Sequence, residues 1–184
     1  EYSALVAAQI LDFKDALYLV RKRGEFMEVA ARMNPGKMAC ILGLETNIVK
    51  AILKETGGYI ANLNCPGQVV VSGTNTQLEL ASIKATERGA KRVIPLDVSG
   101  AFHCSLMDEA SLRLKSEIDK VEFHAPICPL ISNVDAEPQT DAVVIKTNLI
   151  KQVNSATYWE KSMRYLLGNG INDFFEIGPG NVLR

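Results

Sequence analysis

The sequence predicts an α/β protein in which a ferredoxin-like module is inserted between two parts of a larger domain. Between Gly36 and Val98 the apolar periodicity alternates between strand and helix spacing in the order βαββαβ, which is typical of a ferredoxin-like module. After Ser99 strand-like and helix-like segments alternate, which favours a parallel sheet with helices on its faces. The chain has 184 residues, 47% of them hydrophobic, and can therefore fill a packed core.

Two helices are expected before the module. Residues 1–11 have helical spacing, and Asp12 is suited to cap a second helix over 13–33. Its apolar residues recur at helical intervals: Ala16, Leu17, Val20, Phe26, Met27 and Ala30. The breaker Asn34-Pro35-Gly36 ends this helix.

The module itself is assigned to residues 36–98, and residues 1–35 and 99–184 to the larger domain. The elements expected within the module are a strand over 38–44, a helix over 46–55, strands over 59–63 and 68–72, a helix over 76–89 and a strand over 92–96. The elements expected after it are a helix from Leu106, a strand over 129–133, a loop over 137–139, helices over 141–152 and 158–169, and a strand over 173–177. The closing Gly178-Pro179-Gly180 lacks the Lys-Ser/Thr of a phosphate-binding loop and is interpreted as a tight turn.

Composition excludes several classes of protein. Lys and Arg total 20 against 21 for Asp and Glu, which argues against nucleic acid as a partner. The four cysteines are far apart and form no C-x-x-C pair, so neither a metal site nor a disulfide framework is expected. Scattered cysteines suit a reducing compartment, and we predict a cytoplasmic protein. No apolar run is long enough to span a membrane, and no signal peptide is visible.

His103 lies in the stretch most indicative of function. It is one of only two histidines, and it follows an apolar run and the small residues Ser99-Gly100-Ala101. An imidazole between a strand and a helix can face a cleft and act as a base near neutral pH, although a helix-capping or packing role is the alternative. Cys104 is a conceivable nucleophile, but adjacent residues on a helix point apart. His124 is interpreted as a surface residue.

Two further positions carry polar groups of interest. Arg23 shares a predicted helix face with apolar residues, so it requires a partner. That partner could be a structural acid or the carboxylate of a substrate, which a guanidinium can bind through two hydrogen bonds. Asn64 follows a predicted strand in Asn64-Cys65-Pro66-Gly67, which on its own is an ordinary turn.

Together these stretches resemble the bacterial malonyl-CoA:acyl-carrier-protein transacylase family. The family's G-H-S-L-G nucleophile elbow is followed by E-Y-S-A-L-V, with which this chain begins. The other similar stretches, in family order, are Arg21-Lys22-Arg23-Gly24-Glu25-Phe26-Met27, Asn62 to Gln68, Ser99-Gly100-Ala101-Phe102-His103, Ile131-Ser132-Asn133 and Glu176-Ile177-Gly178-Pro179-Gly180.

The resemblance implies a fold and a set of roles. The larger domain would be α/β-hydrolase-like, and no cofactor or metal would be needed because a coenzyme A thioester is the substrate. His103 would be the general base that activates a serine, and the backbone carbonyl of Gln152 would orient its ring. Arg23 would bind the malonyl carboxylate, Phe102 would narrow the pocket against methylmalonyl, and Asn64 would lie near the mouth of the site. The partners would be malonyl-CoA and acyl carrier protein, with the protein a monomer in fatty acid synthesis.

One departure from the family pattern is serious. The 184 residues contain no G-x-S-x-G, so the serine and the oxyanion-hole segment that the resemblance implies are not among them. Because the chain begins within a helical pattern and stops abruptly, we expect the sequence to be a piece of a longer protein. We therefore predict that these residues alone transfer no acyl group.

Two alternatives remain at this point. One is the acyltransferase domain of a polyketide synthase. The other is a non-catalytic module that binds acyl carrier protein through basic residues, for which the candidates are Lys84, Arg88, Lys91 and Arg92.

Overall fold

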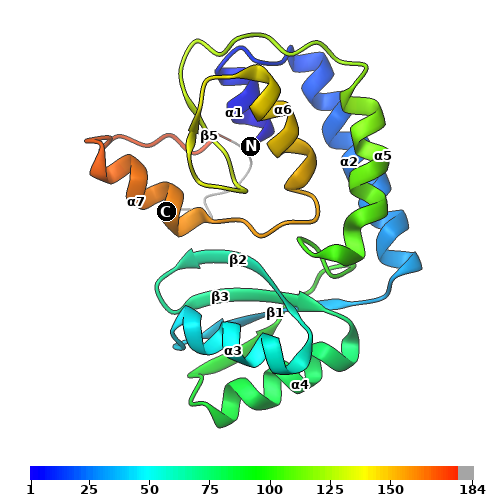
Figure 1. Cartoon of the computed structure of the whole chain (residues 1–184), viewed down its shortest axis with the longest axis vertical. Coiled ribbons are helices and arrows are strands. Elements are labelled where there is room, and N and C mark those ends of the chain that lie inside the picture. The colour runs from blue at the N-terminus through cyan, green and yellow to red at the C-terminus, as the bar shows by residue number, and fades with distance from the viewer. Residues whose placement is uncertain (178–184) are drawn as a thin grey trace.

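A computed structural model describes residues 1–177 and shows a four-stranded sheet lying against a group of helices (Figure 1). The helices are α1 (Tyr2–Ala7), α2 (Phe13–Met33), α3 (Thr46–Thr56), α4 (Asn75–Glu87), α5 (Asp108–Ile118), α6 (Ala142–Lys151) and α7 (Trp159–Gly168), with a short 3₁₀ turn, η1, at Ser105–Met107. The strands are β1 (Lys37–Leu42), β2 (Tyr59–Cys65), β3 (Gln68–Gly73), β4 (Arg92–Pro95), β5 (Leu130–Ile131) and β6 (Pro138–Gln139).

The four-stranded sheet has the strand order β2-β3-β1-β4 and is antiparallel throughout. This is the ferredoxin-like arrangement that the βαββαβ pattern predicts. Strand residues alternate between the two faces. Ala39, Ile41, Val69 and Val71 pack with α3 and α4, whereas Met38, Cys40, Ala61 and Val70 face the opposite way. In Figure 1, α3 and α4 cover the side of the sheet that faces away from the other helices.

The helices above the sheet share a second core. The 21-residue helix α2 runs alongside α5 (Figure 1). The side chains that these helices bury fully include Leu19, Leu114, Ile145 and Leu149. Burial of each such side chain contributes roughly 1.5–3 kcal/mol. The partly buried Phe102 packs against this core and also against the inner face of the sheet. It therefore links the two layers immediately before His103.

The first helix is shorter than the expected 1–11 because a left-handed residue ends it. Gln9 has a φ of 57°. Its N–H donates to the Val6 carbonyl at 3.0 Å, and the N–H of Ile10 donates to the Leu5 carbonyl at 2.9 Å. This is a Schellman cap, and its two apolar residues, Leu5 and Ile10, are buried in the same core. The usual glycine is absent from the cap, so the sequence did not reveal it.

Three other expectations are wrong. Residues 173–177 form no strand, and Phe175 and Ile177 are largely exposed, because no described strand lies beside them to pair with. The predicted parallel sheet is not found among the described residues: β5 and β6 pair antiparallel, and the parallel contact is an isolated bridge between Asn62 and Thr157. The supposed loop at 137–139 contains β6. Gly178-Pro179-Gly180 lies outside the described residues.

The division into domains at residues 36 and 98 remains a prediction, although the sheet and its two helices lie within that range.

Candidate active site

His103 lies in the connection between β4 and η1, not on a helix. Its backbone has a φ of 59°, in the left-handed region that asparagine, aspartate and histidine occupy more readily than most residues. The neighbouring Ala101 and Cys104 are buried, and the ring of His103 is half-buried. The turn therefore holds the imidazole in one place.

Two backbone carbonyls hold the imidazole ring. Its Nδ1 lies 3.0 Å from the carbonyl oxygen of Gln152 and 3.2 Å from that of Ser155. A carbonyl can only accept, so Nδ1 carries the proton and the lone pair of the neutral ring is on Nε2. Gln152 caps the C-terminus of α6, where carbonyl groups lack intrahelical partners and the helix dipole is negative.

The surroundings of His103 favour the neutral ring. Burial is the main cause that lowers its pKa below the ordinary 6.5, and the charge of Arg23 lowers it further. The hydrogen bonds to Gln152 and Ser155 oppose this, because they stabilise the imidazolium. The net shift is downward, so a base is available at neutral pH.

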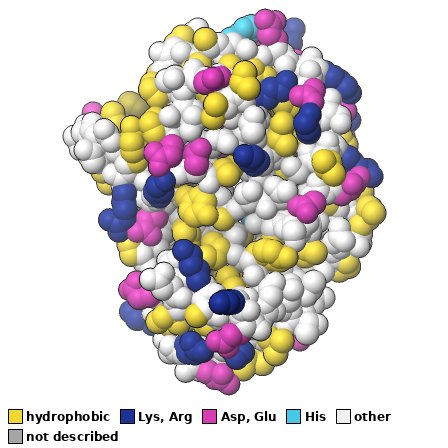
Figure 2. Space-filling model, in the orientation of Figure 1, with side chains coloured by type: hydrophobic (Ala, Val, Ile, Leu, Met, Phe, Trp, Pro, Cys, Tyr) yellow, Lys and Arg dark blue, Asp and Glu magenta, His cyan; other side chains and the backbone are white. Residues whose placement is uncertain are grey.

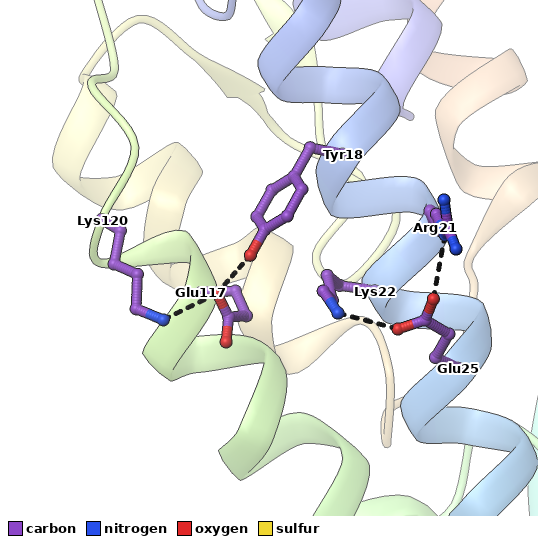
Figure 3. Close-up of polar contacts among 6 residues, drawn as sticks. All are labelled: Tyr18, Arg21, Lys22, Glu25, Glu117 and Lys120. Atoms are coloured by element: carbon purple, nitrogen blue, oxygen red, sulfur yellow. Dashed lines mark hydrogen bonds and ion pairs between the residues drawn. The ribbon is translucent and has the colours of Figure 1, made fainter.

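Arg23 differs from the two basic residues that precede it. Glu25 binds both of those neighbours, at 2.9 Å from Arg21 and 2.9 Å from Lys22 (Figure 3). Tyr18 donates a hydrogen bond to Glu117, and Lys120 forms an ion pair with it, so this face of α2 and α5 is a network of ion pairs and hydrogen bonds. Arg23 takes no part in it: within residues 1–177 its Nε is buried without a hydrogen-bond partner.

The environment of Arg23 is poorly solvated. Burial lowers the pKa of Arg23 and raises that of Tyr2 to about 12. Burial also raises the pKa of Glu1, while the Arg23 charge acts in the opposite direction. Glu1 is a candidate for a structural acid, because its charge raises the pKa of Arg23, yet the two form no ion pair among the described residues. An unpaired buried guanidinium is costly, and an incoming carboxylate would relieve that cost.

The structure brings together some of the predicted site residues and not others. His103, Gln152 and Phe102 are adjacent, and Arg23 is near enough for its charge to affect the imidazole. Asn64 is half-buried in β2, next to the β2–β3 turn. No hydrogen bond among residues 1–177 connects its side chain with His103 or Arg23.

Cys104 is unsuited to nucleophilic attack. Its thiol is buried, its Sγ lies 3.3 Å from the Ala101 carbonyl, and burial raises its pKa. A thiol of raised pKa contains little of the reactive thiolate. His124 is exposed, as expected, and hydrogen-bonds through its backbone to Ile10.

The proposed basic patch is partly neutralised. Lys84 and Arg88 both bind Glu55, at 2.6 Å and 3.1 Å. Figure 2 shows positive and negative side chains interspersed across the viewed face, with no large region of one sign. These basic residues are therefore interpreted as part of an ordinary solvated surface of mixed charge.

The Ser155 carbonyl was not anticipated from the sequence. No side chain marks it, because the contacting group is backbone. Nothing in the sequence around Ser155 indicates that its carbonyl contacts a histidine, because only the fold brings it to the imidazole.

Comparison with known proteins places this chain in a family. The model of the acyl transferase domain matches residues 1–167. The chain belongs to the acyl transferase domain family. A malonyl CoA-acyl carrier protein transacylase of Bacillus subtilis (strain 168) is 50% identical, and the match covers 100% of this chain and 59% of that protein.

Solved structures agree with the family assignment. An acyl carrier protein S-malonyltransferase from Vibrio cholerae matches 98% of this chain and 60% of its own, with a TM-score of 0.94 and 39% identity. A malonyl-transacylase in complex with a type II polyketide acyl-carrier protein matches 97% of this chain and 59% of its own, with a TM-score of 0.93 and 36% identity. The mixed α/β fold class is thus confirmed, and this acyl transferase chain spans about three fifths of such relatives.

The described residues offer neither a membrane span nor a metal cluster. None of the helices within 1–177 has the length and apolar character needed to cross a membrane. Over the same residues, no group of three or more His, Cys, Asp or Glu side chains is placed to hold a metal ion.

Proposed function

We propose that the protein containing this chain transfers a malonyl group from malonyl-CoA to the phosphopantetheine thiol of acyl carrier protein. The observation that carries the proposal is the neutral His103 ring, fixed through Nδ1 by the Gln152 carbonyl and lying near the charge of Arg23, which has no ion-pair partner within residues 1–177. The names of the relatives support the same substrate and acceptor. We further propose that the protein acts in fatty acid synthesis in the cytoplasm. It would be a monomer and would need no cofactor.

The base would work through Nε2. A serine hydroxyl, supplied outside these 184 residues, gives its proton to Nε2 and attacks the malonyl thioester carbonyl. The tetrahedral intermediate collapses, and the thiolate of coenzyme A leaves and takes the proton from the imidazolium. The phosphopantetheine thiol then gives its proton to Nε2, attacks the malonyl ester, and the serine oxygen recovers the proton.

Arg23 would select the acyl group. A malonyl carboxylate pairs with the half-buried guanidinium, whereas an acetyl group leaves it without a carboxylate partner. Phe102, held between the two cores, would restrict the space beside the α-carbon. Asn64 would lie at the entrance, on the strand that faces the helices.

The decisive experiment measures intact mass after incubation with malonyl-CoA. A longer form that carries the G-H-S-L-G elbow is expected to gain one malonyl group, and the 184-residue chain none. Arg23→Ala in the longer form is expected to lower malonyl transfer about a hundredfold, the cost of leaving a charged group without its partner. It should also weaken selection against acetyl-CoA, and unchanged selectivity would show that Arg23 does not bind the carboxylate.

Two other functions have less support. An acyltransferase acting on a polyketide carrier would have the same site, and one solved relative is a malonyl-transacylase in complex with such a carrier. A module that only binds the carrier would depend on the basic patch, two of whose residues are already paired with Glu55.

A further inference from the structure

Strand β2 contacts both segments that make up the His103 site. It lies at the edge of the sheet, so its outer N–H and C=O groups are available for pairing. At its beginning the hydroxyl of Ser105 donates to the Tyr59 oxygen at 2.8 Å. Ser105 is two residues after His103, so this bond connects β2 with the turn that carries the imidazole.

The same strand holds the segment that carries the acceptors. The N–H of Thr157 donates to the Ala61 carbonyl at 2.8 Å, and the N–H of Leu63 donates to the Thr157 carbonyl at 2.9 Å. Thr157 is two residues after Ser155, whose carbonyl accepts from His103. The pairing of β2 with β3 is irregular between Ile60 and Asn62, where this contact forms. The bulge frees the backbone of Ala61 for Thr157.

We propose that β2 acts as a template that sets the spacing between His103 and its two carbonyl acceptors, with Tyr59 and Thr157 as positioning residues. One strand fixes the donor turn at one end and the acceptor segment further along. The left-handed backbone of His103, which few side chains adopt readily, is then held by contacts on both sides. The small sheet thereby selects which ring nitrogen carries the proton.

The catalytic role of this arrangement rests on the proposed function, but the control of the His103 tautomer by β2 does not. The tautomer of His103 is measurable without any acyl transfer. Failure of malonyl transfer with an unchanged tautomer would count against the proposed function alone, whereas a tautomer insensitive to β2 would count against the template alone.

The test is ¹⁵N NMR of the histidine-labelled 184-residue chain at a pH where the ring is neutral. The chain has two histidines, so the exposed His124 provides an internal reference. Wild-type chain is expected to show mainly the Nδ1–H tautomer for His103. Tyr59→Phe is expected to lower the ratio of Nδ1–H to Nε2–H about fivefold, the factor associated with one neutral hydrogen bond.

Two further variants sharpen the result. Thr157→Pro removes the N–H that donates to Ala61 and is expected to shift the tautomer in the same direction. Tyr165→Phe removes a hydroxyl on α7 for which no hydrogen bond is found within residues 1–177, and should leave His103 unchanged. An unchanged tautomer ratio in Tyr59→Phe, with the backbone amide spectrum preserved, overturns the proposal. Because Tyr59 lies at the surface, Tyr59→Phe is expected to fold and tests the proposal even if Thr157→Pro does not fold.

Discussion

The Nδ1 atom of His103 lies 3.0 Å from the carbonyl oxygen of Gln152, at the C-terminal end of α6. A backbone carbonyl thus occupies the place that an aspartate has in a hydrolase triad. It fixes the tautomer and the ring plane, as the carboxylate does, but brings no full negative charge. The imidazolium is therefore less stabilised, and burial dominates the pKa.

Replacing the imidazole should remove base catalysis. In a form that carries the serine, His103→Asn is expected to lower the rate of malonyl transfer about 10²- to 10⁴-fold, the usual contribution of a general base. The measurement is single-turnover formation of the malonyl-serine ester. His124→Asn is the matched control and should retain full activity; a loss below about tenfold in His103→Asn would remove His103 from the mechanism.

Stability should fall in acid because of His103. Its folded pKa is below the ordinary 6.5, so the unfolded chain binds the proton more readily. The stabilising contribution is complete above about 6.5 and is lost as the pH falls from there through the folded pKa. Urea unfolding of the 184-residue chain at several pH values measures this. His103→Asn should flatten the slope as the pH falls below 6.5, and an equal slope in both proteins would contradict the assignment.

Arg23 is expected to lower the stability of the folded chain, although it would serve substrate binding. Arg23→Met removes a half-buried charge whose Nε has no hydrogen-bond partner within residues 1–177 and keeps an apolar stem, so it is expected to raise the free energy of unfolding by about 1–3 kcal/mol. Arg21→Met, which removes an exposed and paired charge, should change stability by less than about 1 kcal/mol. Denaturant titration compares the two. Destabilisation by Arg23→Met would indicate a structural partner for the guanidinium.

Gly100 should not tolerate a larger side chain. A Cβ there would lie 2.5 Å from the Cβ of Ala31 on α2, so one of the two segments would have to move. Gly100→Ala is expected to destabilise the chain by about 1–3 kcal/mol, the cost of overpacking a core. Gly24→Ala is the control: it lies within α2 with nothing within 4 Å, and should stabilise by about 0.5–1 kcal/mol. Thermal unfolding of both variants gives the comparison.

A smaller residue at Phe102 should widen the acyl pocket. In a form that carries the serine, Phe102→Leu is expected to raise the transfer of methylmalonyl relative to malonyl about tenfold, the lower range for one methyl group in an apolar pocket. Competition between the two thioesters provides the ratio. Phe26→Leu, also a partly buried phenylalanine at the helical core, should leave that ratio unchanged. An unaltered ratio in Phe102→Leu would place Phe102 outside the pocket.

The sequence was most informative where local rules decide the structure. The βαββαβ pattern from β1 to β4 follows from strand and helix periodicity, and each boundary lies close to its expected residue. Thr74 and Gln77 form a capping box that begins α4 where the chain predicts a helix. His103 and Arg23 stood out as candidate site residues because an imidazole and an apolar-face guanidinium are rare and chemically specific, and their roles stay predictions.

Other features depend on groups that the sequence does not display. The Gln152 carbonyl was expected only through the family resemblance, and the Ser155 carbonyl was not expected at all. Both are backbone atoms, and their positions depend on how α6 ends and where Thr157 docks. Residues 173–177 have the composition of a strand, but a strand requires a neighbour for its hydrogen bonds, and the described chain provides none there. Local propensity indicates what a segment can form, and tertiary contacts decide whether it does.

The left-handed backbone at His103 restricts which residues could ever replace it. A residue that replaces His103 has to meet two requirements: it must transfer a proton, and it must adopt a φ near 59°. Valine, isoleucine and threonine fail on backbone geometry before chemistry is considered, whereas glycine and asparagine keep the turn and lose only the ring. A map of tolerated substitutions at this position would therefore show asparagine as folded but inactive.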